Sequence, residues 1–131
     1  MRLLLDTHIA LWAVSEPTRL KQHAQEQIVN PDNDVLISLV SLWEIAIKRS
    51  TGRARIDVPS LSARDTMVAF SDADFEMLAI KADHIDAVEV LQRHHGDPFD
   101  RLLVAQAWTE RLTFLTHDKT LGQYGDFVMV V

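Results

Sequence analysis

The chain has 131 residues, of which 47% are hydrophobic and 24% charged, with a formal net charge of −6 and no cysteine. The length and composition fit a single globular domain over residues 1–131, and the lack of cysteine excludes disulfides and cysteine-based zinc sites. The negative net charge argues against general electrostatic binding of nucleic acid. No apolar stretch reaches the roughly 20 residues that cross a bilayer, so we expect a soluble protein with no membrane association and a cytoplasmic location.

The first half of the chain alternates short apolar runs with helical patterns. The run at residues 2–5 is too short for a helix and ends at a polar residue, which predicts a buried strand, and Thr7 can cap the next helix. Asn30 and Pro31 break the second helical pattern, and Gly52 ends the third. The expected elements are a strand at 2–5, helices at 8–14 and 18–29, a strand at 34–38 and a helix at 39–50.

The second half continues this alternation after a loop-like segment at residues 51–60. Asp97 followed by Pro98 gives the clearest helix start, because Asp is a favourable N-cap and Pro fits the first helical position. The expected elements are a helix at 61–70, a strand at 75–80, helices at 82–92 and 98–111, and strands at 112–115 and 127–131. Alternating strands and helices imply an α/β fold with a mainly parallel sheet covered on both faces.

Some apolar side chains of these elements have an expected place in the core. The spacing in the helix at 82–92 predicts that Ile85 and Val88 face inward. Core packing is also the expectation for the tryptophans Trp12, Trp43 and Trp108.

Four carboxylates stand where an apolar element ends or where apolar residues flank them: Asp6, Glu44, Asp100 and Asp118. Asp6 and Asp118 both follow predicted parallel strands, whose carboxyl ends meet at the edge where α/β sheets bind ligands. Four unpaired acids at one place would repel one another strongly. A hard divalent cation with oxygen ligands, Mg²⁺ or Mn²⁺, is the simplest remedy.

Each acid also has an ordinary structural interpretation. Asp6 and Asp118 can cap the helix or turn that follows, and Glu44 can pair with Lys48 one helical turn later. Against this, Glu44 lies among apolar residues, and a carboxylate at a core margin needs a partner.

The two acids at the start of the helix at 98–111 differ in their expected roles. The N-cap explains Asp97 without any active site, and an acid at Asp100 also favours the helix dipole. Asp100, however, shares a face with the apolar stripe of Leu103, Val104 and Ala107. We therefore expect Asp100 to point into a crevice.

Two further clusters have weaker functional interpretations. His94, His95 and His117 suggest a zinc site, but adjacent histidines in a glycine-containing turn seldom converge on one ion, and the usual zinc spacings are absent. The basic residues Lys48, Arg49, Arg53 and Arg55 form a solvated surface or a patch that steers a phosphate backbone toward the acids.

Four segments carry a resemblance to a known family. They are Leu4-Leu5-Asp6-Thr7-His8, Ser41-Leu42-Trp43-Glu44-Ile45, the run from His95-Gly96-Asp97-Pro98-Phe99-Asp100-Arg101 to Ala107, and Leu115-Thr116-His117-Asp118. Through them the chain resembles, along essentially its whole length, the PIN-domain nucleases, particularly the VapC-type ribonuclease toxins of type II toxin–antitoxin pairs. The third segment is the most specific of the four.

The resemblance implies a PIN-like three-layer α/β/α sandwich with a central, mainly parallel sheet of four to five strands. It implies an endoribonuclease dependent on Mg²⁺ or Mn²⁺, acting on single-stranded or loop RNA, with a homodimeric state and a partner antitoxin that occludes the acidic crevice. It assigns the catalytic and metal-binding roles to Asp6, Glu44, Asp100 and Asp118. Asp97 matches an additional acid of this branch, and Thr7, Ser41 and Thr116 match hydroxyls that support the carboxylates.

Other functional classes remain as alternatives. A haloacid dehalogenase-type phosphotransferase needs a second Asp where this chain has His8, and a receiver domain needs an acid cluster that is absent. A non-catalytic module could use the acidic crevice to bind a basic peptide. A housekeeping RNA-processing nuclease of the same fold is the nearest alternative to a toxin.

Overall fold

The computed structural model describes residues 1–52 and 61–131. The expected loop at 51–60 thus lies almost wholly outside the described residues. In chain order the elements are β1 (Arg2–Leu5), α1 (Thr7–Ser15), η1 (Pro17–Arg19), α2 (Gln22–Val29), β2 (Asp34–Ser38), α3 (Leu39–Ser50), α4 (Ala63–Asp72), β3 (Glu76–Leu78), α5 (Ala82–Val90), α6 (Pro98–Glu110), β4 (Thr113–Thr116), η2 (Lys119–Tyr124) and β5 (Val128–Val130).

The strands found in the described residues form one five-stranded sheet in the order β3-β2-β1-β4-β5, and every neighbouring pair is parallel. In the centre of the sheet, Leu4 of β1 pairs with Leu36 of β2 on one side and with Phe114 of β4 on the other. The chain builds the sheet outward from β1 through β2 and β3, and then returns to add β4 and β5 on the other side. Strand order therefore reverses beside β1, which is where open α/β sheets bind ligands.

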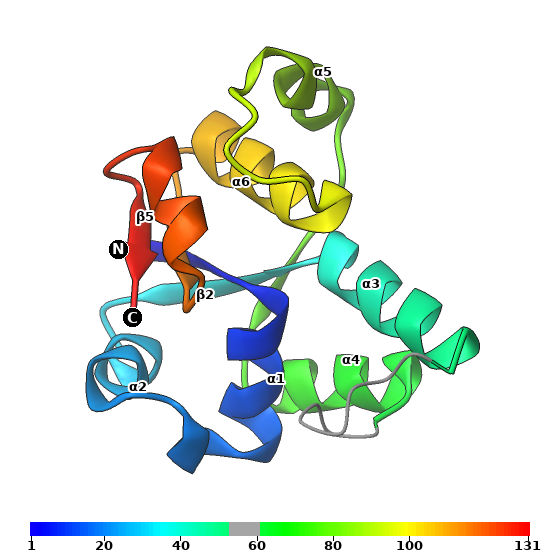
Figure 1. Cartoon of the computed structure of the whole chain (residues 1–131). Helices are drawn as coiled ribbons and strands as arrows, with labels where there is room; N and C mark the ends of the chain where they lie inside the picture. The colour runs from blue at the N-terminus through cyan, green and yellow to red at the C-terminus, as the bar shows by residue number, and fades with distance from the viewer. Residues whose placement is uncertain (53–60) are drawn as a thin grey trace.

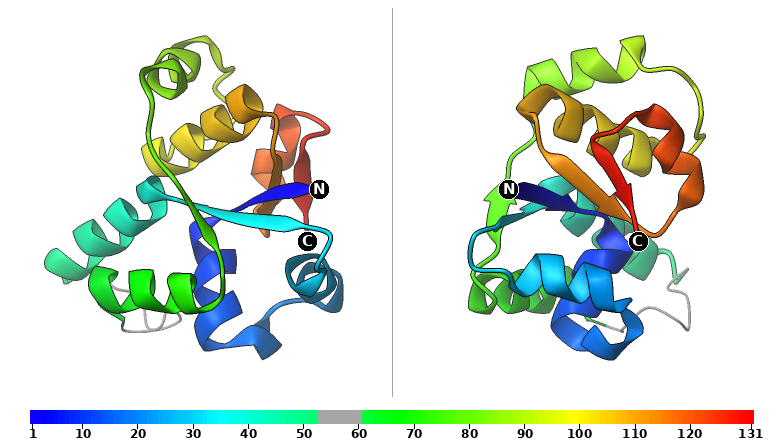
Figure 2. Two further views of the ribbon diagram at one scale, coloured as in Figure 1. Left: turned by 180° about the vertical axis from the view of Figure 1, so that it is seen from behind. Right: turned by 90° about the vertical axis from the view of Figure 1, so that its left-hand side faces the viewer.

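Alternate side chains of the strands point to opposite faces, and each face has its own helices. Leu4, Leu36 and Phe114 pack with residues of α6, and Val88 of α5 adds to that core. Leu3, Leu5 and neighbouring apolar residues pack on the other face with residues of α1, α2 and α4. Figures 1 and 2 show the sheet between these two helical layers, with α3 beside it. The predicted three-layer α/β/α architecture and mainly parallel sheet are confirmed.

The first helices differ from the prediction in two places. Residues 18–29 do not form one helix, because Leu20 adopts an extended conformation between η1 and α2, which places its buried side chain on the same core as Ala24. The predicted cap by Thr7 is wrong: Asp6 occupies the N-cap position of α1, and Thr7 lies in the first turn. This frees the Thr7 hydroxyl for a different contact, described below. The short helix η2 was not predicted.

The inward face predicted for α5 is wrong at Ile85, which is 55% exposed. His84 is fully buried instead, because its ring has partners on both sides. Its Nδ1 accepts the Lys81 N–H at 3.0 Å, and its Nε2 lies 2.8 Å from Glu110 Oε1. The predicted burial of Val88 against the core is confirmed.

Two of the three tryptophans also depart from the predicted core packing. Trp43 is 53% exposed and Trp108 51% exposed, whereas Trp12 packs, partly buried, against the core formed with α1 and α2. None of the helices in the described ranges has the length and apolar character required to cross a membrane.

Candidate active site

Asp6 and Asp118 lie at the carboxyl ends of the adjacent strands β1 and β4, as their sequence positions predict. Asp6 is buried, and its Oδ2 accepts a hydrogen bond of 2.6 Å from the Thr116 hydroxyl. The same Thr116 oxygen accepts the backbone N–H of Asp118 at 3.0 Å. Burial raises the pKa of Asp6, and the hydrogen bond from Thr116 partly offsets this rise. Thr116 therefore couples the two acids across the strand pair.

Asp118 is more exposed than Asp6, Glu44 and Asp100, and its carboxylate has two hydrogen-bond donors. Its Oδ1 accepts the backbone N–H of Thr120 at 2.9 Å, so it also caps η2 as the structural interpretation predicts. Its Oδ2 lies 3.0 Å from Nε2 of His95. Although partial burial acts to raise it, the pKa of Asp118 is lowered by these two hydrogen bonds. Asp118 is thus held ionised.

Glu44 projects from α3 and is only 3% exposed, and both of its carboxylate oxygens have partners. Thr7 donates to Oε1 at 2.8 Å, and the Lys48 ammonium lies 2.5 Å from Oε2. The hydroxyls of Thr7 and Ser41 lie 2.9 Å apart. The predicted Glu44–Lys48 pair is therefore present, and the expectation that a carboxylate at the core margin needs partners is confirmed.

Asp97 and Asp100 stand at the start of α6 with the two different roles expected for them. Asp97 is the N-cap, because its Oδ1 accepts the N–H groups of Phe99 at 2.8 Å and Asp100 at 3.2 Å. Asp100 points toward the other acids instead of capping. Burial, and then the charges of Asp6, Asp97, Glu44 and Asp118, raise the pKa of Asp100 to about 8.

All five acids line one cleft of about 230 Å³. Its other lining residues are His8, Lys48, His95 and His117. A larger cleft of about 490 Å³ lies at the amino ends of β2 and β3. No set of three potential metal-binding side chains in the described part of the chain converges there, so we place the candidate site in the smaller acidic cleft.

The contacts of the two ring nitrogens define the tautomer of His95 in this cleft. Its Nδ1 accepts the backbone N–H of Asp97 at 3.1 Å, so Nδ1 carries no proton, and the neutral ring must carry its proton on Nε2. That N–H points at Asp118, with Asp100 Oδ2 3.6 Å from the same nitrogen. Ligand atoms of His95, Asp100 and Asp118 all lie within 4.8 Å of one another. In this arrangement, however, His95 is a hydrogen-bond donor and not a metal ligand.

The remaining histidines of the zinc hypothesis do not join this group. The His94 ring packs against Tyr124, with ring centroids 5.0 Å apart. The His117 ring packs against His8 and Trp12. Of the basic residues, Lys48 lines the cleft, whereas Arg53 and Arg55 lie outside the described residues.

The donor set of the cleft fits a hard divalent cation. Five carboxylates dominate it, whose oxygens Mg²⁺ and Mn²⁺ prefer, and the chain has no cysteine thiolate to favour zinc. The raised pKa of Asp100 has mutual repulsion among its causes, which a bound cation would relieve. Asp100 and Asp118 are close enough to share an ion, whereas Glu44 would first have to exchange one of its present partners.

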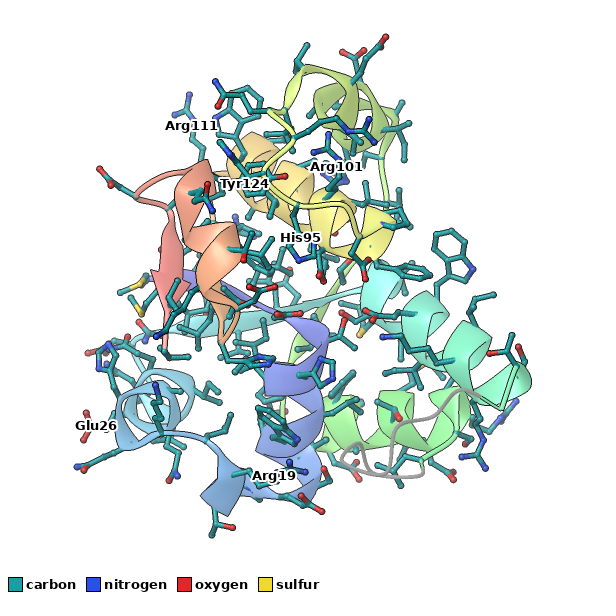
Figure 3. The ribbon with its side chains drawn as sticks, viewed as in Figure 1. Arg19, Glu26, His95, Arg101, Arg111 and Tyr124 are labelled. Atoms are coloured by element: carbon teal, nitrogen blue, oxygen red, sulfur yellow. The ribbon has the colours of Figure 1, made fainter. Side chains whose placement is uncertain are left out.

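Arg101 is a supporting residue that the sequence interpretation missed. It is 8% exposed, and its guanidinium donates to the carbonyls of Val88 and Gln92 and to the hydroxyl of Tyr124, all at 2.9–3.0 Å. Figure 3 shows Arg101 beside Tyr124 and above His95. The arginine thus ties the end of α5 and the following loop to α6 and η2. The only sequence signal was a charged residue inside an apolar helical stripe.

Comparison with known proteins gives one family match. The PIN domain family model matches residues 3–126 of this chain. The protein Ribonuclease VapC22 of Mycobacterium tuberculosis (strain ATCC 25618 / H37Rv) is 29% identical over 122 residues, which cover 93% of this chain and 91% of that protein.

Solved structures share the fold at low sequence identity. VapBC2 from Rickettsia felis, bound to a DNA fragment from its promoter, matches with a TM-score of 0.70 and 15% identity over 100% of this chain and 98% of that chain. A toxin–antitoxin complex from Klebsiella pneumoniae matches with a TM-score of 0.63 and 20% identity over 98% and 96% of the two chains. DNA-bound VapBC from Salmonella typhimurium matches with a TM-score of 0.68 and 14% identity over 100% and 97%.

Proposed function

This chain belongs to the PIN domain family, and from that premise we propose that it is a metal-dependent endoribonuclease that hydrolyses RNA phosphodiester bonds in the acidic cleft. The observation that carries the proposal is the gathering of five carboxylates around one small cleft, with the pKa of Asp100 raised to about 8. Such repulsion costs stability without benefit to the fold, so it favours a functional purpose for the cluster.

The proposed ligands of Mg²⁺ or Mn²⁺ are Asp6, Asp100 and Asp118, with Glu44 joining directly or through water. Asp97 uses one carboxylate oxygen to cap α6, so we propose only a lesser role in metal binding for its second oxygen. When bound there, a divalent ion would lower the pKa of a coordinated water, which supplies the nucleophile for in-line attack on the phosphate, and would offset charge on the phosphorus oxygens.

The chain's own residues would prepare this chemistry. Asp100 must release its proton before it can coordinate an ion. The negative charge of its carboxylate therefore becomes available only when an ion binds. The His95 N–H and the Thr120 N–H hold the Asp118 carboxylate in one orientation. Lys48, which is partly exposed at the rim, offers a cation for a phosphate of the RNA.

We also propose that the protein is the toxin of a type II toxin–antitoxin pair, forms a homodimer and acts in the cytoplasm. The names of the similar proteins support the toxin assignment: Ribonuclease VapC22 among relatives, and VapBC or toxin–antitoxin complexes among structures of the same fold. A neighbouring reading frame for a small DNA-binding antitoxin favours a toxin, whereas its absence favours a housekeeping RNA-processing nuclease.

Cleavage of total RNA and transfer RNA by the purified protein tests the proposal. Reactions contain Mg²⁺, Mn²⁺ or EDTA, and Asp100→Asn, a near-isosteric change, is compared with Asp86→Asn on the exposed surface of α5. We expect cleavage that needs the cation, survives Asp86→Asn and is lost in Asp100→Asn. Cleavage that survives Asp100→Asn contradicts the site, and absence of cleavage in every condition favours a non-catalytic binding module.

A further inference from the structure

Three aromatic side chains form a cluster at one wall of the acidic cleft. The ring centroid of His117 lies 5.3 Å from that of Trp12 and 5.4 Å from that of His8. The centroids of His8 and Trp12 lie 5.8 Å apart. The planes are inclined to each other by 54–65°. In such edge contacts a ring is supported without having both of its faces covered.

The three rings differ in their exposure, and the outermost is beside the acids. Trp12 and His8 are partly buried, whereas His117 is exposed. His8 and His117 both line the cleft that holds Asp6 and Asp118. His117 immediately precedes Asp118 and follows Thr116, whose hydroxyl bonds to Asp6, so its backbone position relative to both acids is fixed.

The inner part of the cluster is built as a rigid support. Trp12 packs against the core formed with α1 and α2, and the Arg19 guanidinium lies 4.8 Å from its ring centroid. Figure 3 shows Arg19 at the end of α1 far from His95. His8 completes this support, because its ring contacts the rings of both Trp12 and His117.

We propose that His117, supported by His8 and Trp12, is a nucleobase-binding subsite that stacks an unpaired base next to the scissile phosphate. This inference rests on the proposed ribonuclease function. Bases of single-stranded RNA are free to stack on aromatic rings, whereas bases in a duplex are not. Because His117 and Asp118 line the same cleft, a base stacked on the ring lies near a phosphate held at the carboxylates.

The test compares His117→Ala, which removes the ring, with His117→Phe, which keeps a flat ring but removes both nitrogens. Cleavage of a single-stranded RNA oligonucleotide is measured first, and the cleaved bond is mapped. The same oligonucleotide is then made with an abasic nucleotide on either side of that bond. Far-UV circular dichroism and thermal melting establish that each variant is folded.

We expect His117→Ala to raise KM about tenfold with kcat changed less, because a stacked base contributes on that order to binding. His117→Phe retains a KM close to that of the unmodified protein. One of the two abasic substrates is expected to raise the KM of the unmodified protein as much as His117→Ala does. With the His117→Ala variant, the same substrate should cause no further rise in KM. This lack of additivity is the signature of a direct base–ring contact.

Three results overturn the inference. These are an unchanged KM in His117→Ala, a His117→Phe variant as impaired as His117→Ala, and additive losses for the variant with both abasic substrates. Each of them leaves cleavage and its dependence on Asp100 intact, so the proposed function stands. If the unmodified protein neither cleaves RNA nor binds the oligonucleotide in a fluorescence anisotropy titration, both the function and the subsite are wrong.

Discussion

Replacing Asp100 by Asn is expected to stabilise the metal-free protein while it destroys the proposed activity. The pKa of Asp100 is about 8 in the folded protein, against 3.8 for the ordinary side chain, because of burial and four neighbouring acids. Between these two values the folded state holds a proton that the unfolded state has released, so stability falls as pH rises, by about 1.4 kcal/mol per pH unit. At pH 7 the accumulated cost approaches about 4 kcal/mol.

Asn keeps the shape of the protonated acid but never ionises in either state, so the variant avoids this cost. Because the neighbouring acids share part of the repulsion, we expect a gain of about 2 to 4 kcal/mol in the free energy of unfolding at pH 7, or roughly 10 °C in melting temperature. The gain shrinks as the pH falls and vanishes below the ordinary pKa of 3.8, where wild-type Asp100 holds its proton in both the folded and the unfolded state. Stability above pH 8 changes no further through this group.

Urea unfolding followed by circular dichroism, in EDTA at several pH values, measures this difference. Asp86→Asn on exposed α5 is the matched control and should leave the free energy of unfolding within about 0.5 kcal/mol of wild type. Adding Mg²⁺ or Mn²⁺ should stabilise the wild type more than Asp100→Asn, because the variant lacks a ligand. An Asp100→Asn protein that is equally or less stable than wild type at pH 7 in EDTA would refute the reasoning.

Three further predictions concern the same site and its support. The affinity for Mn²⁺ should fall by up to about tenfold per pH unit below pH 8, because Asp100 must lose its proton to coordinate; calorimetric titrations at pH 6 and pH 7 that give equal affinities contradict this. His95→Asn keeps an acceptor for the Asp97 N–H but cannot reach Asp118, whereas His95→Gln keeps a donor toward Asp118. We therefore expect Mn²⁺ affinity to fall about tenfold in His95→Asn and much less in His95→Gln, and the reverse order in a calorimetric titration would show that the loop contact matters more. Arg101→Lys should lower the free energy of unfolding by about 2 to 3 kcal/mol, because lysine cannot serve the Val88 and Gln92 carbonyls and the Tyr124 hydroxyl together; a urea midpoint equal to that of wild type argues against this role.

The sequence was sufficient to predict those features that depend on local chemistry and periodicity. The apolar run of β1 is too short for a helix, and Asp97-Pro98 is a strong helix start, so both elements have nearly the predicted bounds. Parallel strands bring their carboxyl ends to one edge, which made the proximity of Asp6 and Asp118 predictable. For Asp97 and Asp118 the capping interpretation and the cleft position both hold, because a single carboxylate oxygen of each residue makes the capping bond while the residue still lines the cleft.

The features that were missed depend on contacts between distant segments. His84 displaces Ile85 from the core because Glu110 and the Lys81 N–H satisfy its ring, and no periodicity encodes those partners. The exposure of Trp43 follows from where α3 lies beside the sheet, since nothing in the described residues covers that side of the helix fully. The donor role of His95 depends on a backbone N–H two residues later, which residue spacing alone cannot distinguish from a metal ligand.

A crystal grown with Mn²⁺ and measured where manganese scatters anomalously tests the central claim most directly. The account predicts an anomalous peak in the acidic cleft, coordinated by oxygens of Asp100 and Asp118 or Asp6, and no such peak in Asp100→Asn crystals grown at the same Mn²⁺ concentration. A peak coordinated by the His95 nitrogen, a peak outside the cleft alone, or an empty cleft at saturating Mn²⁺ would contradict the proposal that these carboxylates hold the catalytic ion.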